Sequence, residues 1–199
     1  DSKSPQPNFV KKSAKEVAER LRKGPRMLDL VREYTENGFH NLNTSMRKCP
    51  PDFRCVRGKD REMLEAMEKA ITETPPFPEP VEVYRGLSRL APRTYSRLVA
   101  AARNAMESGK DFGMPSITST STDAGKALGV FGKGSKDTSV VFKIKAKTGM
   151  PLHSVSRFSE NEIVQSSRVR HRVTQVGESE IVKDGQSSGP RTIIFLEEI

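Results

Sequence analysis

The sequence has no tryptophan, few other aromatic residues and no long apolar run. Aromatic residues make up 6% of the 199 residues and hydrophobic residues 34%. A chain of this length can still bury a core, so the low aromatic content does not exclude a globular fold. No apolar stretch approaches the length of about 20 residues that a membrane-spanning helix needs, and no signal peptide is apparent. We therefore expect no membrane span.

Cysteine and histidine are also scarce. The cysteines are Cys49 and Cys55, and the histidines are His40, His153 and His171. Neither the number nor the spacing of these residues matches a zinc site, so we expect no metal. The close spacing of the cysteines permits a small disulfide loop, but two free thiols are favoured.

Two common nucleotide-binding motifs are absent. No strand is followed by GxGxxG, so a Rossmann site is not supported, and no GxxxxGK[ST] predicts a P-loop. Any nucleotide chemistry must therefore use another scaffold.

An excess of basic residues is the main compositional feature. The 34 Lys and Arg residues outnumber the 25 Asp and Glu residues, which gives a formal net charge of +9 and a pI near 9.7. Such a charge attracts nucleic acid, anionic membranes, acidic proteins or an anionic cofactor. The two signs are interleaved, and an ordinary basic globular domain fits the same numbers.

Helical periodicity dominates the first third of the sequence. After a flexible lead-in over residues 1–12, a capping box at Ser13–Glu16 predicts a helix that stops at Gly24-Pro25. Apolar residues continue at helical spacing beyond this stop, and a further helix is expected over Asp60–Thr72. We therefore predict a helical lobe over residues 13–80.

The pattern changes after the proline-rich connector Thr74–Pro80. A short strand is expected over Val81–Tyr84 and a helix over Pro92–Met106. Alternating apolar residues then predict three further strands, at Val140–Lys145, Val169–Val173 and Ile193–Leu196. Helices followed by mostly antiparallel strands predict the α+β class, with residues 81–199 forming two packed antiparallel sheets and a cleft between them.

Three short polar features follow one another in the β-rich part. They are Tyr84-Arg85-Gly86 at the end of a strand, Ser119-Thr120-Ser121 and Glu160-Asn161-Glu162. Singly they are weak signals, because a strand-ending arginine is usually solvated and a Ser/Thr run is usually a loop or a strand edge. Two carboxylates at i and i+2 of a strand repel each other, which costs free energy unless one of them has a purpose.

Together the three features resemble the Arg, Ser-Thr-Ser, Glu-x-Glu pattern of the ADP-ribosyltransferase toxin family. The most similar branch contains the clostridial binary toxins and the arginine-specific bacterial effectors. The helix pattern over Tyr34–Arg47 and the aromatic Phe131 also match, and the resemblance covers residues 28–173. It implies the ADP-ribosyltransferase fold, with NAD⁺ as co-substrate in the cleft between the sheets and no metal.

The resemblance implies a role for each motif residue. Cleavage of the nicotinamide–ribose bond develops positive charge on the ribose, and Glu162 is implied to stabilise that charge. Ser119 is implied to hold Glu162 in place, and Arg85 to bind the pyrophosphate with its guanidinium fork. Glu160 is implied to position an acceptor arginine and to take its proton.

Weaker matches complete the implied site. Gly86 is implied to let its backbone approach the nicotinamide, and Phe131 to stack on the nicotinamide ring. Phe158 matches an aromatic on the loop that, with Glu160, recognises the target protein. Further cofactor contacts are assigned to polar and basic residues near the motifs: Asn43, Arg47, Thr120, Ser121 and Lys133. Lys133 supplies charge without a bidentate fork.

We therefore expect a mono-ADP-ribosyltransferase that transfers ADP-ribose from NAD⁺ to an arginine of a target protein. The resemblance implies a secreted toxin or effector domain, delivered into the cytosol of a target cell. The implied partners are a target protein, acidic in character, and a cognate immunity protein. Because the first residue is Asp rather than Met, we expect a domain from a longer protein.

Three alternatives keep the same fold. The acceptor could be nucleic acid, bound by the ladder of Arg168, Arg170 and Arg172, although no aromatic residues are interleaved there. It could be water, which makes the protein mainly an NAD⁺ glycohydrolase. The third alternative is a non-catalytic binding module, against which the presence of Arg85 and both acidic residues argues.

Overall fold

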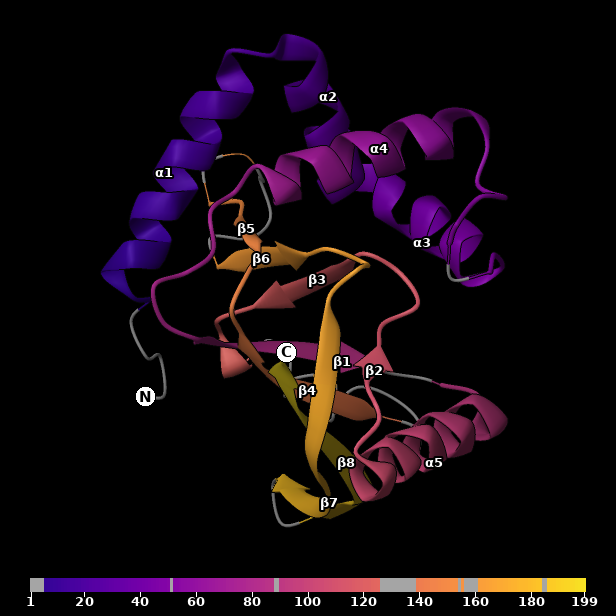
Figure 1. Cartoon of the computed structure of the whole chain (residues 1–199). Coiled ribbons are helices and arrows are strands. Elements are labelled where there is room, and N and C mark those ends of the chain that lie inside the picture. The colour runs from indigo at the N-terminus through magenta and orange to yellow at the C-terminus, as the bar shows by residue number, and fades with distance from the viewer. Residues whose placement is uncertain are drawn as a thin grey trace.

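A computed structural model describes residues 6–50, 52–87, 90–125, 139–153, 155, 161–183 and 186–199. The helical elements, shown in Figure 1, are α1 (Asn8–Arg22), α2 (Pro25–Glu33), the π-helix η1 (Tyr34–Gly38), α3 (Phe39–Arg47), α4 (Gly58–Thr72) and α5 (Pro92–Ser108). The strands are β1 (Val81–Leu87), β2 (Phe112–Gly113), β3 (Thr118–Ser121), β4 (Val140–Ala146), β5 (Met150–Pro151), β6 (Glu162–Gln165), β7 (Arg170–Lys183) and β8 (Gln186–Glu198). None of the helices in these ranges is long and apolar enough to cross a bilayer.

The strands form one mixed sheet in the order β2-β7-β8-β4-β1-β3-β6-β5, in which only β4 and β8 pair in parallel. The predicted α+β class is confirmed, but the predicted separation into two antiparallel sheets differs from the observed hydrogen bonding. The two parts of the sheet are joined through β1, which pairs with β4 along its whole length but with β3 only at Tyr84 and Ser121. This single pair makes one sheet out of the two expected.

The first helix begins earlier than its sequence signal predicts. Helix α1 begins at Asn8, five residues before the capping box, so part of the predicted lead-in is helical. The carbonyl of Pro7 accepts the first backbone hydrogen bond, from Val10, and the fully buried Val10 side chain packs in the core. Burial of that valine therefore extends the helix beyond the cap that the sequence suggested. The predicted stop at Gly24-Pro25 is confirmed, with Pro25 in the first turn of α2.

Two hydrophobic cores lie on opposite sides of the β3–β6 pair. The helical core contains side chains of α1 to α4 together with Val164, and the sheet core lies beneath α5 and contains Ile163. Successive side chains of a strand point to opposite faces, so neighbours on β6 enter different cores. Figure 1 shows β3, β5 and β6 beneath the helical lobe, with β4, β7 and β8 farther from it.

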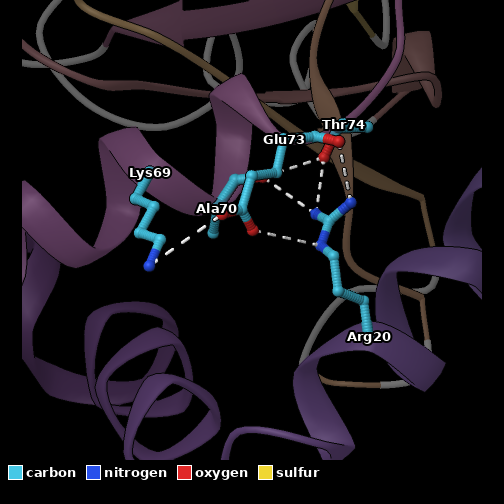
Figure 2. Close-up of polar contacts among 5 residues, drawn as sticks. All are labelled: Arg20, Lys69, Ala70, Glu73 and Thr74. Carbon is cyan, nitrogen blue, oxygen red and sulfur yellow. Dashed lines mark hydrogen bonds and ion pairs between the residues drawn. The ribbon is translucent and has the colours of Figure 1, made fainter.

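Arg20 of α1 fixes the carboxyl end of α4 (Figure 2). Its guanidinium donates to the carbonyls of Ala70 at 2.9 Å and Glu73 at 3.0 Å, and to the Thr74 hydroxyl at 2.9 Å. The last carbonyls of a helix have no partner within the helix, and they carry partial negative charge that attracts a cation. Arg20 therefore joins the first and last helices of the lobe.

The connection between α3 and α4 is closed by a disulfide between Cys49 and Cys55. The expectation of two free thiols is therefore wrong. The backbone amide of Cys49 donates to Met46 at the end of α3, and that of Phe53 donates to Pro50, which turns the chain back on itself. These turns bring the two cysteine Cα atoms within 5.7 Å, a distance that a disulfide spans.

Candidate active site

The described residues of the three polar motifs lie on or next to neighbouring strands. Tyr84 of β1 pairs with Ser121 of β3, and Ser121 pairs with Glu162 of β6 on its other side. Adjacent strands are about 4.8 Å apart. Segments that are far apart in the sequence therefore meet at one rung of the sheet, next to Arg85.

The two serines of β3 share one face of the strand, and Thr120 lies on the other. Ser119 and Ser121 are partly exposed, whereas Thr120 is buried. The Thr120 hydroxyl donates to the carbonyl of Ile163 at 2.6 Å. The structure therefore does not bring Thr120 together with the other predicted cofactor contacts, because its hydroxyl fastens β3 to β6 instead.

Arg85 is partly buried and reaches toward β3. Its Nη1 atom donates to the carbonyl of Ser119 at 3.3 Å. Burial lowers the pKa of Arg85 and Arg47 acts in the same direction, while Tyr34 and Glu162 oppose the shift. Arginine stays protonated despite such a shift, so the site keeps a partly desolvated positive charge.

Tyr34 is a member of the site to which the sequence analysis gave no individual role. Its side chain is fully buried, yet its hydroxyl lies 3.4 Å from Oγ of Ser119. Burial raises the pKa of Tyr34, and hydrogen bonds with Ser119 and Asn43 act against that rise. The hydroxyl therefore stays neutral and able to donate at physiological pH. A buried tyrosine hydroxyl usually needs a polar partner, which is the signal that could have identified it.

The π-helix η1 places Tyr34 and the beginning of α3. It ends at Gly38, where an added Cβ would lie 2.6 Å from Cε of Met63 and 3.2 Å from the carbonyl of Glu33. A larger residue there would have to displace the end of the Met63 side chain. Such π-helical turns often occur at functional sites. This one connects α2 to α3.

Helix α3 contributes the two predicted residues Asn43 and Arg47. Asn43 is buried, and its Oδ1 atom has no hydrogen-bond partner among the described residues. Arg47 is exposed, donates to Thr44 at 3.3 Å and interacts electrostatically with Arg85. A buried acceptor without a partner costs free energy unless a ligand donates to it.

Strand β6, which begins with Glu162, is held at both ends. Before the strand, the carbonyl of Asn161 accepts from the amide of Thr122 at 3.0 Å. At its other end, Nε2 of Gln165 donates to the buried Glu198 at 3.1 Å. Glu68 of α4 accepts from the next two residues, Ser166 and Ser167. Glu162 therefore stands on a strand that both parts of the molecule fix.

Comparison with known families gives one match across nearly the whole chain. Residues 6–194 match the model described as ADP-ribosyltransferase exoenzyme. The chain belongs to the ADP-ribosyltransferase exoenzyme family. The resemblance seen in the motifs is therefore confirmed, although no curated protein matches the sequence.

Solved structures with the ADP-ribosyltransferase fold are similar despite low identity. Exoenzyme S from Pseudomonas aeruginosa, bound to carba-NAD and 14-3-3 protein beta, is 19% identical with a TM-score of 0.65, over 94% of this chain and 81% of that one. The Vis ADP-ribosyltransferase of Vibrio splendidus, bound to agmatine, is 19% identical with a TM-score of 0.60, over 98% and 88%. The Clostridium limosum C3 exoenzyme is 16% identical with a TM-score of 0.66, over 100% and 98%. These likenesses show the fold.

Some predicted residues of this ADP-ribosyltransferase domain lie outside the described residues. They are Phe131, Lys133, Phe158 and Glu160. Gly86 lies on β1 opposite Val141 of β4, next to Arg85. Within the described ranges, no group of three His, Cys, Asp or Glu side chains could hold a metal ion.

Proposed function

We propose that this domain cleaves NAD⁺ at the nicotinamide–ribose bond and transfers the ADP-ribose to an arginine of a target protein. The observation that supports this most is the single rung of Tyr84, Ser121 and Glu162, which puts Arg85 and the proposed catalytic carboxylate on the two strands that flank β3. Membership of an ADP-ribosyltransferase family supplies the reaction class.

NAD⁺ binds at Arg85 and Arg47, whose charges interact. Arg85 is partly buried, and Arg47 disfavours its charged form electrostatically. A pyrophosphate between the two guanidinium groups would neutralise that repulsion and accept charge-assisted hydrogen bonds. The buried Oδ1 atom of Asn43 would accept from a ribose hydroxyl or an amide of the same ligand. Exoenzyme S, with the same fold, binds the analogue carba-NAD.

The chemistry divides between the two acidic residues. Glu162 stabilises the positive charge that develops on the ribose as nicotinamide leaves with the bonding electrons. Ser119 orients Glu162 and is itself held by the hydroxyl of Tyr34. A guanidine nitrogen of the acceptor then attacks the ribose carbon, and its proton passes to Glu160. The products are nicotinamide, ADP-ribosylated arginine and a proton.

Two considerations support arginine as the acceptor. Glu160 supplies a carboxylate that can position and deprotonate a guanidinium, and agmatine is bound by the Vis enzyme, which has the same fold. Agmatine carries the guanidinium group of arginine. We further infer that the domain acts as a secreted toxin or effector in the cytosol of a target cell, as expected from its family.

The test is incubation with NAD⁺ and agmatine, followed by quantification of nicotinamide and ADP-ribosyl-agmatine. We expect one adduct for most nicotinamide molecules released. Glu160→Gln removes the acceptor base, so it should abolish adduct formation while nicotinamide release continues.

Three results would contradict the proposal. Release without any adduct from the wild-type protein would identify a glycohydrolase. Equal transfer by Glu160→Gln would exclude the proposed division of roles. Labelling of RNA or DNA in place of agmatine would make nucleic acid the acceptor.

A further inference from the structure

The connection between α3 and α4, together with the first turn of α4, exposes a group of cations near the proposed site. We call Lys48, Arg54, Arg57 and Lys59 the basic rim. All four are exposed, with 87% of the Arg54 side chain and 84% of the Lys59 side chain accessible. Asp52 pairs with Arg54 at 3.3 Å and Glu33 pairs with Lys59 at 3.5 Å. Such exposed pairs are weak, so the rim keeps a positive field.

The backbone that carries the basic rim is fixed on several sides. The Cys49–Cys55 disulfide closes it, and Arg61 donates to the carbonyls of Phe53 at 2.6 Å and Val56 at 3.0 Å. The Phe53 side chain packs against the helical core, with the backbone in the left-handed region at φ 55°. A surface ordered in advance loses little conformational entropy when a partner binds.

The basic rim begins next to a residue of the proposed site. Lys48 directly follows Arg47, which interacts electrostatically with Arg85 of the site. Figure 1 shows α3 and the connection after it at the opposite end of the helical lobe from α1. A protein acceptor that reaches Arg85 therefore comes close to Lys48.

We propose that the basic rim docks an acidic surface of the protein acceptor, so that the preferred substrate is an arginine near several carboxylates. This rests on the proposed transfer to arginine. Positive charge next to the site steers an acidic partner and raises its association rate. The only aromatic residue between Lys48 and Lys59 is Phe53, which packs on the core and leaves no stacking platform for nucleic acid bases.

The experiment compares two synthetic peptides at saturating NAD⁺ and low salt. Both contain one arginine, which is flanked by glutamates in one peptide and by glutamines in the other, and agmatine serves as the acceptor without flanks. For the wild-type domain we expect kcat/KM to be about tenfold higher for the acidic peptide. Since exposed charges are screened by salt, the preference should shrink above about 0.3 M NaCl.

Variants then test whether the rim causes the preference. Lys48→Glu/Arg54→Glu should remove it and leave transfer to agmatine within about twofold, because neither residue belongs to the proposed site. The matched control is Lys11→Glu/Lys12→Glu, which makes the same charge change at exposed positions of α1 and should keep the preference. Lys48→Gln/Arg54→Gln, with its thermal midpoint measured, replaces the first variant if charge reversal impairs folding, and it should lower the preference by less.

The outcomes separate this proposal from the function on which it rests. If agmatine is modified but the peptides are equivalent, or if the rim variants keep the preference, the docking proposal fails alone. If poly(U) inhibits peptide modification through the rim and the acidic peptide is not preferred, the rim binds nucleic acid instead. If the wild-type domain does not modify agmatine, both proposals fail.

Discussion

The helical lobe and the sheet contribute to the site by different physical means. The sheet places Arg85, Ser119 and Glu162 through backbone register, which fixes neighbouring residues whatever their side chains. The lobe places Tyr34 and Asn43 through packing, with both residues buried among apolar side chains. Residues fixed by register form recognisable sequence motifs, whereas Tyr34, which is fixed by packing, has the same helical spacing as the apolar residues around it.

The largest effect that we predict concerns the sheet side. Glu162→Gln keeps the shape of the side chain and removes the charge that stabilises the transition state. We expect NAD⁺ cleavage to slow by about 10²–10³, with NAD⁺ affinity nearly unchanged. Single-turnover kinetics together with calorimetric titration of NAD⁺ would measure both. Near-normal cleavage by a folded variant would remove Glu162 from the chemistry.

The second prediction concerns the pH dependence of the stability of the sheet. Burial lowers the pKa of His171 to about 4, and the neighbouring charge of Arg170 acts in the same direction. In the unfolded chain the pKa is about 6.5, so the unfolded state binds more protons between these values. Stability is therefore complete above pH 6.5 and is lost as the pH falls toward 4, by about 3 kcal/mol.

Denaturant unfolding at pH 7 and at pH 4.5 would measure this loss. His171→Leu should lose much less free energy of unfolding between these two pH values. Because Glu198 is present in both proteins, its own titration contributes to both losses and drops out of the difference. Equal losses in the two proteins would show that other groups cause the acid sensitivity.

A third prediction tests how the lobe is held together. Arg20→Met keeps the apolar part of the side chain and removes the hydrogen bonds to the end of α4 shown in Figure 2. We expect the free energy of unfolding to fall by about 2 kcal/mol. Arg22→Met, at an exposed position of the same helix, should change it little. If both variants unfold alike, the Arg20 contacts contribute nothing measurable.

The smallest effect should come from the buried hydroxyl that joins the two regions. Tyr34→Phe removes the contact to Ser119 and should lower the rate of NAD⁺ cleavage about fivefold, equivalent to about 1 kcal/mol. Tyr95→Phe is the control, because the Tyr95 hydroxyl lies 2.6 Å from that of Thr192, away from the motif residues. A rate change of the same size in both variants would mean that the Tyr34 hydroxyl acts only on stability.

The sequence predicted the sheet side of the site more completely than the lobe side. Residue order was enough to bring Arg85, Ser119 and Glu162 together, since the motifs occupy adjacent strands. It did not show that Thr120 faces the sheet core, because alternation along a short polar strand gives two faces without saying which is buried. Tyr34 was hidden because a tyrosine at helical spacing has the same pattern as a core residue.

Element lengths were predicted least well where pairing does not depend on apolar side chains. The strands expected at Val169–Val173 and Ile193–Leu196 belong to β7 and β8, which extend as a hairpin to the pair Lys183 and Gln186. Backbone hydrogen bonds continue there through a polar stretch that lacks the usual alternation of a strand. The helices, in contrast, lie close to their predicted ranges apart from the beginning of α1.

The Cys49–Cys55 disulfide makes the connection between α3 and α4 respond to the redox state of its surroundings. Such a bond persists in oxidising surroundings and is reduced by glutathione or thioredoxin in a cytosol. The hydrogen bonds from Arg61 and the packing of Phe53 do not depend on the sulfur atoms. In oxidising surroundings the bridge therefore protects this connection against unfolding. After its reduction, the remaining contacts preserve the shape of the surface beside the site.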